Sequence, residues 1–339
     1  MRRTTMAQRL ILVLWSGLFV WGLAFWAPSA QAQYFGRNKV QYEKFDFKVM
    51  KTEHFDIFFY PREQKAVETA ARLAERWYKR LSRIFSYEFK RRQPLILYGS
   101  HPQFEQTTVI PDIMGEGTGG VTEIFKRRIV LPFGATLAET DHVIGHELIH
   151  AFQFDITSQY AGNNRMADSA ALRLPLWFIE GMAEYLSIGP LDPNTAMWMR
   201  DAIREKKMPT VKQMVSSRFF PYRFGQALWA YIGGRWGDLT VARMLREAGR
   251  QGDYEKMMER VLGLPLKKLS EDWHEALKKD YLPLSSTSKD PKDFGPLVVK
   301  GSEMAGYNVS PAISPDGRRF AFLSSKELFS IELYLANAV

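Results

Sequence analysis

The sequence reads His146-Glu147-Leu148-Ile149-His150 near the middle of its 339 residues, a pattern that predicts a metal site on a helix. Residues four apart on an α-helix lie on one face, about one turn apart. Two imidazoles at that spacing bind a single zinc ion through ring nitrogens, while Glu147 faces the open side of the ion, where a water sits. The chain has only six histidines, so a chance match is a poor explanation. The alternative is a helix with two structurally paired histidines.

A zinc site needs a third protein ligand, and the segment Trp177-Phe178-Ile179-Glu180-Gly181-Met182-Ala183-Glu184-Tyr185 offers one. Glu180 and Glu184 are again four apart and share a helix face. Glu180 is the expected third ligand, and Glu184 is expected to accept the other ring N–H of a ligand histidine. A solvated acidic face is the alternative, but unpaired carboxylates would be costly among these apolar neighbours.

Composition narrows the chemistry further. The chain contains no cysteine, which excludes disulfides, thiolate zinc sites and cysteine nucleophiles, so any metal must be held by His, Asp or Glu. Hydrophobic residues make up 46% and charged residues 24%, values typical of a globular protein. The formal net charge is +9. The densest basic run is Lys90-Arg91-Arg92, with Lys79, Arg80 and Arg83 upstream; it favours a solvated helix face over a nucleic-acid or lipid patch, so no nucleic-acid partner is expected.

The first 32 residues are typical of a secretory signal. Three arginines within nine positions precede an apolar run from Leu10 to Trp26, and Ala30-Gln31-Ala32 supplies a small-x-small end. These features predict cleavage after Ala32 and an exported protein, periplasmic or extracellular, with no stable membrane span. Because the apolar run is close to spanning length, an uncleaved membrane anchor is the alternative.

The hydrophobic pattern predicts an α+β fold. Alternation over 44–60 indicates two strands, spacings of three and four over 63–85 indicate a helix, and 95–98 and 121–132 indicate a strand and then an edge strand or hairpin. From 137 to 277 the pattern is mainly helical, with breaks expected at Gly189-Pro190, Pro209, Pro221 and Gly233-Gly234. The expected parts are a signal peptide (1–32), a unit with a mixed or antiparallel sheet (33–135), a helical zinc-binding unit (136–282), a polar linker (283–296) and a short β-unit (297–339).

These motifs resemble the gluzincin metallopeptidases, the thermolysin and aminopeptidase-N group with the peptidase MA-like fold. The aminopeptidase branch carries a Trp-x-x-Glu-Gly-x-Ala segment with the ligand Glu, and here the segment runs from Trp177 to Ala183. That branch also has a Pro-Tyr-x-x-Gly segment, matched here by Pro221-Tyr222-Arg223-Phe224-Gly225, whose Tyr steadies the oxyanion. The resemblance therefore implies that Tyr222 is catalytic. The alternative is an ordinary aromatic at a helix start, with Tyr231, Tyr185 or Arg223 as the next candidates.

The sequence also departs from that branch. A Gly-x-Met-Glu-Asn segment precedes the zinc helix in the aminopeptidases, and its Glu binds the free amine of the substrate. The corresponding stretch here, Gly119-Gly120-Val121-Thr122-Glu123, matches poorly, which leaves aminopeptidase and endopeptidase activity equally open. An edge strand at 121–130 is still expected to bind an extended peptide by strand addition.

The C-terminal stretch 308–322, with Ser314-Pro315-Asp316-Gly317 at its centre, looks like a TolB-type β-propeller repeat. Pro presets φ and Gly supplies a positive φ, so this tetrapeptide favours a turn between two strands. One blade cannot close a propeller, so 297–339 is interpreted as a truncated repeat and the chain as a piece of a longer protein. A plain hairpin is the alternative.

The expected function is that of an exported zinc metallopeptidase with one Zn²⁺ per chain, held by His146, His150 and Glu180. The expected partner is a peptide or protein substrate, with Glu147 as general base. One alternative is a non-enzymatic envelope scaffold with a structural zinc, whose propeller binds a protein partner. Another is a zinc hydrolase that acts on a different bond. His54, His101 and His274 need no special role, and His142 is expected at the surface or core edge rather than behind the metal.

Overall fold

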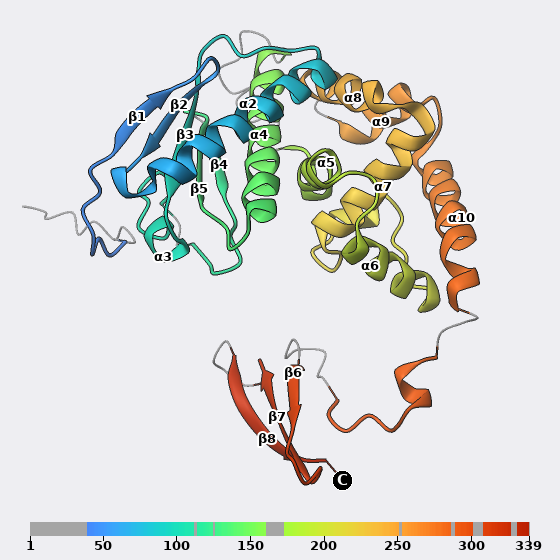
Figure 1. Ribbon diagram of the computed structural model, residues 1–339. Coiled ribbons are helices and arrows are strands. Elements are labelled where there is room, and N and C mark those ends of the chain that lie inside the picture. The colour runs from blue at the N-terminus through green and yellow to red at the C-terminus, as the bar shows by residue number, and fades with distance from the viewer. Residues whose placement is uncertain are drawn as a thin grey trace, which may run out of the picture.

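The computed structural model describes residues 39–111, 114–124, 126–160, 173–250, 253–285, 289–300, 308–326 and 331–338. They form a mixed α/β structure with a five-stranded sheet, a set of helices and a separate three-stranded sheet (Figure 1). The expected secretory signal, residues 1–32, lies outside the described residues. Within the described part, no helix has the length and apolar character needed to cross a membrane.

The five-stranded sheet is mixed. Its strand order is β1-β2-β3-β5-β4; β2, β3 and β5 are mutually parallel, while the edge strands β1 and β4 are antiparallel to their neighbours. The bounds of its strands are β1 Lys48–Lys51, β2 Phe55–Phe59, β3 Gln93–Tyr98, β4 Val121–Glu123 and β5 Arg128–Pro132. The segment 121–132 is therefore a hairpin with β4 on the outer edge, as the sequence pattern indicated.

The two faces of this sheet are covered differently. Alternate residues of β2, Phe55, Ile57 and Phe59, are buried in the same cluster as the apolar face of α2 (Gln64–Phe85). A second, smaller apolar cluster contains Tyr98 of β3 and Val130 of β5, which pack with Phe104 of α3 (His101–Phe104). Helix α2 ends at Ser86, whose left-handed backbone stops the helix, and a 3₁₀ turn (Pro61–Glu63) precedes it.

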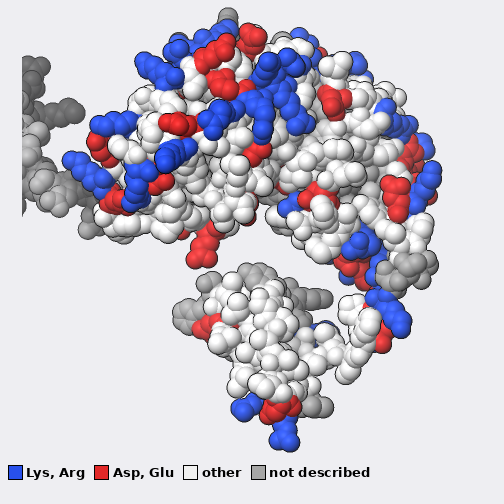
Figure 2. Space-filling model, in the orientation of Figure 1, with Lys and Arg blue, Asp and Glu red and all other residues white. Residues whose placement is uncertain are grey.

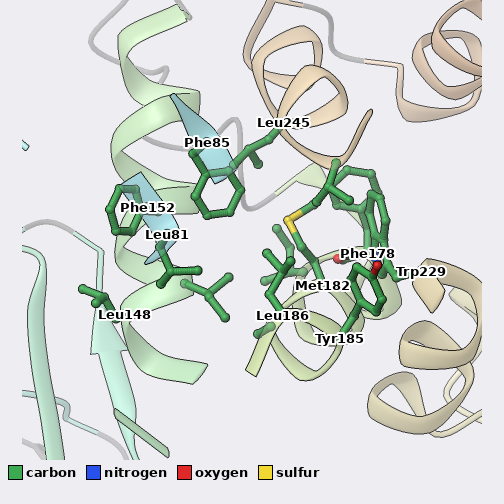
Figure 3. Packing of buried hydrophobic residues seen from close by; sticks show 14 of the residues in the cluster. Leu81, Phe85, Leu148, Phe152, Phe178, Met182, Tyr185, Leu186, Trp229 and Leu245 are labelled. Carbon is green, nitrogen blue, oxygen red and sulfur yellow. Dashed lines mark hydrogen bonds between the residues drawn. The ribbon is translucent and has the colours of Figure 1, made fainter. Parts of the chain in front are cut away.

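The remaining helices form the second half of this unit. They are α4 Leu137–Tyr160, α5 Leu176–Ile188, α6 Pro193–Arg204, α7 Pro221–Trp236, α8 Asp238–Arg250, α9 Tyr254–Leu262 and α10 Leu266–Ser285, with 3₁₀ turns at Gln213–Val215 and Pro291–Asp293. Figure 3 shows the joint between the halves, where side chains of α2 and α4 meet those of α5, α7 and α8. Among them are Leu81, Phe152, Met182, Trp229 and Leu245. The helix α4 is thus held between the sheet and the helical half.

Two expectations from the sequence are wrong, one about helix α7 and one about the basic run that follows α2. The break at Gly233-Gly234 is absent, because α7 runs unbroken to Trp236 and ends where Gly237 takes φ +82°. Gly233 instead provides room for the Tyr185 hydroxyl, which a Cβ there would meet at 2.1 Å. The run Lys90-Arg91-Arg92 is also not on a helix; it lies in the connection between α2 and β3, whereas the upstream Lys79, Arg80 and Arg83 are exposed on α2 as expected. In addition, α10 continues into the first residues of the expected linker.

The C-terminal strands form an antiparallel sheet with the order β6-β7-β8, built from β6 Asn308–Ile313, β7 Arg319–Ser324 and β8 Glu332–Asn337. Gly317 at φ +71° turns the chain between β6 and β7, and the Arg319 amide donates to Ser314 Oγ, 3.0 Å away. The sheet lies apart from the helices in Figure 1. The described residues contain no closed propeller.

Helices α5 and α7 touch through their backbones. A Cβ added to Gly181 would lie 2.4 Å from the Gly225 backbone, and a Cβ added to Gly225 would lie 2.3 Å from the Trp177 carbonyl oxygen. No side chain fits in that space, so these two glycines set the separation of the helices. The Trp229 indole N–H also donates to the Phe178 carbonyl, 3.0 Å away, across the same contact.

We predict that Gly225→Ala destabilises the protein by about 1–3 kcal/mol or more, because the added methyl group forces α5 and α7 apart. Gly234→Ala is the matched control in the same helix. Gly234 is exposed and a Cβ there meets nothing within 4 Å, so alanine should stabilise by about 0.5–1 kcal/mol. Urea unfolding followed by circular dichroism measures both changes. Equal midpoints for the two variants would contradict the close-contact argument.

Candidate metal centre

Two histidines of α4 face the helical half of the protein. His146 and His150 are one turn apart and buried, with 8% and 7% of their surfaces exposed. Helix α5 brings Glu180 to the same place from the other side. The structure therefore brings together the three residues expected as metal ligands, although 29 residues separate His150 from Glu180 in the chain.

The three donor atoms form a nearly equilateral triangle. His146 Nε2 lies 3.1 Å from His150 Nε2 and 3.2 Å from Glu180 Oε2, and His150 Nε2 lies 3.3 Å from the same carboxylate oxygen. Ligands about 2.0–2.1 Å from a tetrahedral zinc ion are about 3.3 Å from one another. The donor set and its spacing therefore fit a metal ion such as zinc, and no fourth His, Asp or Glu of the described residues joins the three.

On the far side of each ring, a hydrogen-bond acceptor for His150 and a nearby carboxylate for His146 favour the proton on Nδ1. The Gln153 amide nitrogen donates to the Ile179 carbonyl at 2.9 Å, which leaves Gln153 Oε1 to accept from His150 Nδ1 at 2.8 Å. His146 Nδ1 lies 3.1 Å from Glu184 Oε1. In the neutral rings both Nε2 atoms therefore present a lone pair toward Glu180, and three converging lone pairs make a cation site.

The pKa values of the cluster reflect this concentration of acceptors. Burial lowers the pKa of His146, but hydrogen bonds to Glu180 and Glu184 outweigh burial and raise it to about 10. Burial also lowers the pKa of His150, but the charge of Glu180 and a hydrogen bond to it raise that pKa above its ordinary value. Burial raises the pKa of Glu180, and the charge of His150 and hydrogen bonds to both imidazoles hold it well below its usual range. The pocket thus favours positive charge strongly.

Glu184 is buried behind His146 and is neutralised by a cation. Its Oε2 lies 3.1 Å from Arg223 Nη1, and the same guanidinium nitrogen lies 3.3 Å from Asp192 Oδ2. Asp192 also caps α6 by accepting from the Thr195 amide at 2.7 Å. Burial raises the pKa of Glu184, while His142 and His146 lower it, to about 2 overall. Sequence reasoning considered Arg223 only as a substitute for Tyr222 and missed this ion pair.

His142 is nearer to the site than expected. Its Nε2 lies 3.3 Å from Glu184 Oε1, the oxygen that also faces His146. His142, His146 and Glu184 therefore form a second group able to hold a metal ion, sharing His146 with the first. We favour the group with His150 and Glu180, because the Glu184 carboxylate already carries the Arg223 counter-charge. The spacing of His142 four residues before His146 was the sequence signal for this contact.

Glu147 is positioned from the sheet. The Thr122 hydroxyl of β4 lies 2.6 Å from Glu147 Oε2, and a Cβ on Gly120 would lie 2.9 Å from Glu147 Cγ and 3.0 Å from Oε1. The edge strand therefore both holds the carboxylate and leaves room for it. The Glu147 carboxylate is near enough for its charge to raise the pKa values of His146, His150 and Tyr222. No motif in the sequence pointed to Thr122.

Tyr222 lies at the same site. Its ring is nearly parallel to that of His146, with centroids 6.0 Å apart and an interplanar angle of 19°. Burial, followed by the Glu180 carboxylate, raises the pKa of Tyr222 well above its ordinary value, which keeps the hydroxyl protonated. The substitutes are engaged elsewhere: the Tyr185 hydroxyl donates to Asp238 at 2.6 Å, and Tyr231 accepts from Arg235 at 2.7 Å.

Other residues raised by the sequence lie away from the cluster. Glu123 Oε2 lies 3.1 Å from Arg128 Nε and also contacts the Lys126 amide, so it is tied to its own hairpin turn. His54 pairs with Glu75 at 2.6 Å, and His274 lies 2.8 Å from the Pro209 carbonyl oxygen. His54 reaches Glu75 and Glu53 through different ring nitrogens, a pattern typical of ion pairing rather than of metal binding.

Comparison with known proteins adds no assignment. No protein-family model matches the chain, and no curated protein matches it at a significant level. The interpretation of the site therefore rests on its geometry and on the motifs quoted above.

We predict that the purified protein binds close to one equivalent of zinc, because three suitable ligands converge at one point. His146→Ala and Glu180→Ala should each lose the metal, and His274→Ala, which alters a histidine on α10, should retain it. Elemental analysis by mass spectrometry measures the content of each variant. Full zinc occupancy in both ligand variants would show that the ion binds elsewhere.

Proposed function

We propose that this protein is a zinc-dependent peptidase of the gluzincin type, exported from the cytoplasm. The observation that carries the proposal is the convergence of His146 Nε2, His150 Nε2 and Glu180 Oε2, with the Glu147 carboxylate near enough for its charge to raise the pKa values of both histidines. A structural zinc normally has four protein ligands and needs no such carboxylate. Among the residues that the structure describes, three protein donors converge, which favours an ion that acts on a substrate.

Zinc, when bound, would lower the pKa of a water and polarise the carbonyl that is attacked. Glu147 has the role of general base. Held by Thr122, it accepts the proton of the attacking water and delivers it to the leaving amine nitrogen. Glu184 and Gln153 keep the proton of each imidazole on Nδ1, and Arg223 stabilises the buried charge of Glu184.

Tyr222 has the role of oxyanion donor. Its raised pKa keeps the hydroxyl protonated at neutral pH, so the group donates a hydrogen bond where negative charge develops on the carbonyl oxygen. The ring lies against His146, on a helix start fixed by Pro221 at the first helical position.

The choice of a peptide as substrate is supported by the edge strand. Among the described residues β4 pairs with β5 alone, so its outer side can accept an extended chain beside Glu147. The two other candidate functions are a zinc hydrolase acting on another bond and a scaffold with structural zinc. Digestion of a mixed peptide library, with and without a chelator, separates both from the peptidase.

We predict that Glu147→Gln retains zinc and loses activity by at least about 10²-fold, because glutamine keeps the shape of the side chain but cannot accept a proton. Glu88→Gln, an exposed change on the loop after α2, is the control and should match the wild type. Peptide hydrolysis and metal content are measured on the same samples. Wild-type turnover in Glu147→Gln would favour the scaffold.

We predict that Tyr222→Phe lowers turnover by about 10²–10³-fold with little change in zinc content or substrate affinity, because the hydroxyl acts mainly in the transition state. Tyr231→Phe removes a hydroxyl from the same helix that faces Arg235 instead, and should leave turnover unchanged. Steady-state kinetics on one peptide substrate distinguishes the two. An equal loss in both variants, or a loss confined to KM, would contradict the role of Tyr222.

A further inference from the structure

A second concave site lies away from the metal centre. It is a cavity of about 820 Å³ lined by three segments: the connection between α2 and β3, the turn between β4 and β5, and the last part of α4. None of the proposed metal ligands or catalytic residues lines it. In Figure 1 the connection from α2 to β3 crosses the top of the molecule beside the upper end of α4.

The lining of this cavity is strongly basic. Its cationic residues are Lys90, Arg91, Arg92, Lys126 and Arg127, and its one acidic residue is Asp155. Asp155 is buried and already accepts from the Tyr87 hydroxyl at 2.6 Å while pairing with Arg127. Its charge is therefore used to hold Arg127 in place and is not available to the other cations.

Most of these cations have no counter-charge. Throughout the part of the chain that the structure describes, no carboxylate pairs with Lys90, Arg91 or Lys126. The Arg92 Nε atom donates to the Thr52 carbonyl at 2.8 Å, which directs this guanidinium without neutralising it. Like charges brought together in this way repel one another, and an anion in the cavity removes the repulsion.

The backbone is arranged to keep the two basic segments together. Arg127 takes φ +53°, a left-handed conformation that is unfavourable for a residue with a Cβ. The Gln93 amide donates to the Arg127 carbonyl and thereby ties the start of β3 to the hairpin turn. The cations thus come from segments more than thirty residues apart that are joined at a defined point, unlike side chains scattered on a mobile loop.

We propose that this cavity binds a small ligand carrying two or more phosphate groups. Guanidinium groups pair with phosphate oxygens in a bidentate manner, and lysines add point charges. The volume lies within the range of small-ligand pockets and exceeds what one phosphate fills. A nucleic acid fits less well, because Lys and Arg are interspersed with Asp and Glu over the face that Figure 2 shows.

The proposal is tested by titrating the full-length protein with inorganic pyrophosphate in a calorimeter, at physiological ionic strength. Inorganic phosphate and citrate are titrated in parallel. We expect one pyrophosphate per chain, bound at least about tenfold more tightly than either comparison anion, since bridging charge-assisted contacts add to its affinity. Citrate binding as tightly as pyrophosphate would overturn the assignment to phosphate, and the absence of pyrophosphate binding would overturn the site.

Two double variants locate the binding. Arg91→Gln with Lys126→Gln should weaken pyrophosphate binding by about tenfold or more. Lys65→Gln with Lys267→Gln removes the same charge from exposed positions elsewhere and should change it little. An equal loss in both would attribute binding to overall charge and overturn the site. Because pyrophosphate also binds zinc, the titration is repeated with His146→Ala; binding that disappears there would place the anion at the metal instead.

Discussion

The backbone contact between Gly181 and Gly225 is the constraint on which the site depends. Glu180 and Glu184 lie on α5, and Tyr222 and Arg223 lie on α7, so the separation of these helices sets how both pairs meet α4. Any side chain at the contact would add to that separation and open the triangle around His146. The glycine in each motif is therefore as much a part of the site as the charged residues beside it.

Charge balance explains the rest of the arrangement. Carboxylates removed from water are tolerated only when each has a positively charged partner, and α5 carries two of them: Glu184, which is buried, and Glu180, which is half-buried. Arg223 neutralises Glu184, and the position facing Glu180 is filled by imidazole nitrogens whose protons are held on the opposite side. Glu184 thus positions His146, whereas Glu180 remains able to bind a metal ion, although the two residues are only four positions apart in the sequence.

The part of the site that the sequence predicted is the part set by helix periodicity. The spacing of four predicted that His146 lies with His150 and Glu180 with Glu184. Alternation predicted the two strands within 44–60, but the parallel order of β2, β3 and β5 was not predicted. Thr122, Gln153 and the Arg223–Glu184 pair could not be predicted, because they depend on which elements meet in space. The expected break at Gly233-Gly234 failed for the same reason, since close packing and chain breaks both call for glycine.

The short hairpin of β4 and β5 has a consequence for the protein as a whole. Thr122, which hydrogen-bonds to Glu147, is the residue before Glu123 in β4. Glu123 pairs with Arg128 at the end of the hairpin, and the turn between these two residues carries the cations Lys126 and Arg127 of the cavity. A ligand that fixes the conformation of this turn would also reduce the conformational fluctuations of β4. By thermodynamic linkage any such effect is reciprocal, so a peptide docked along β4 would change the affinity of the turn for anions by the same factor.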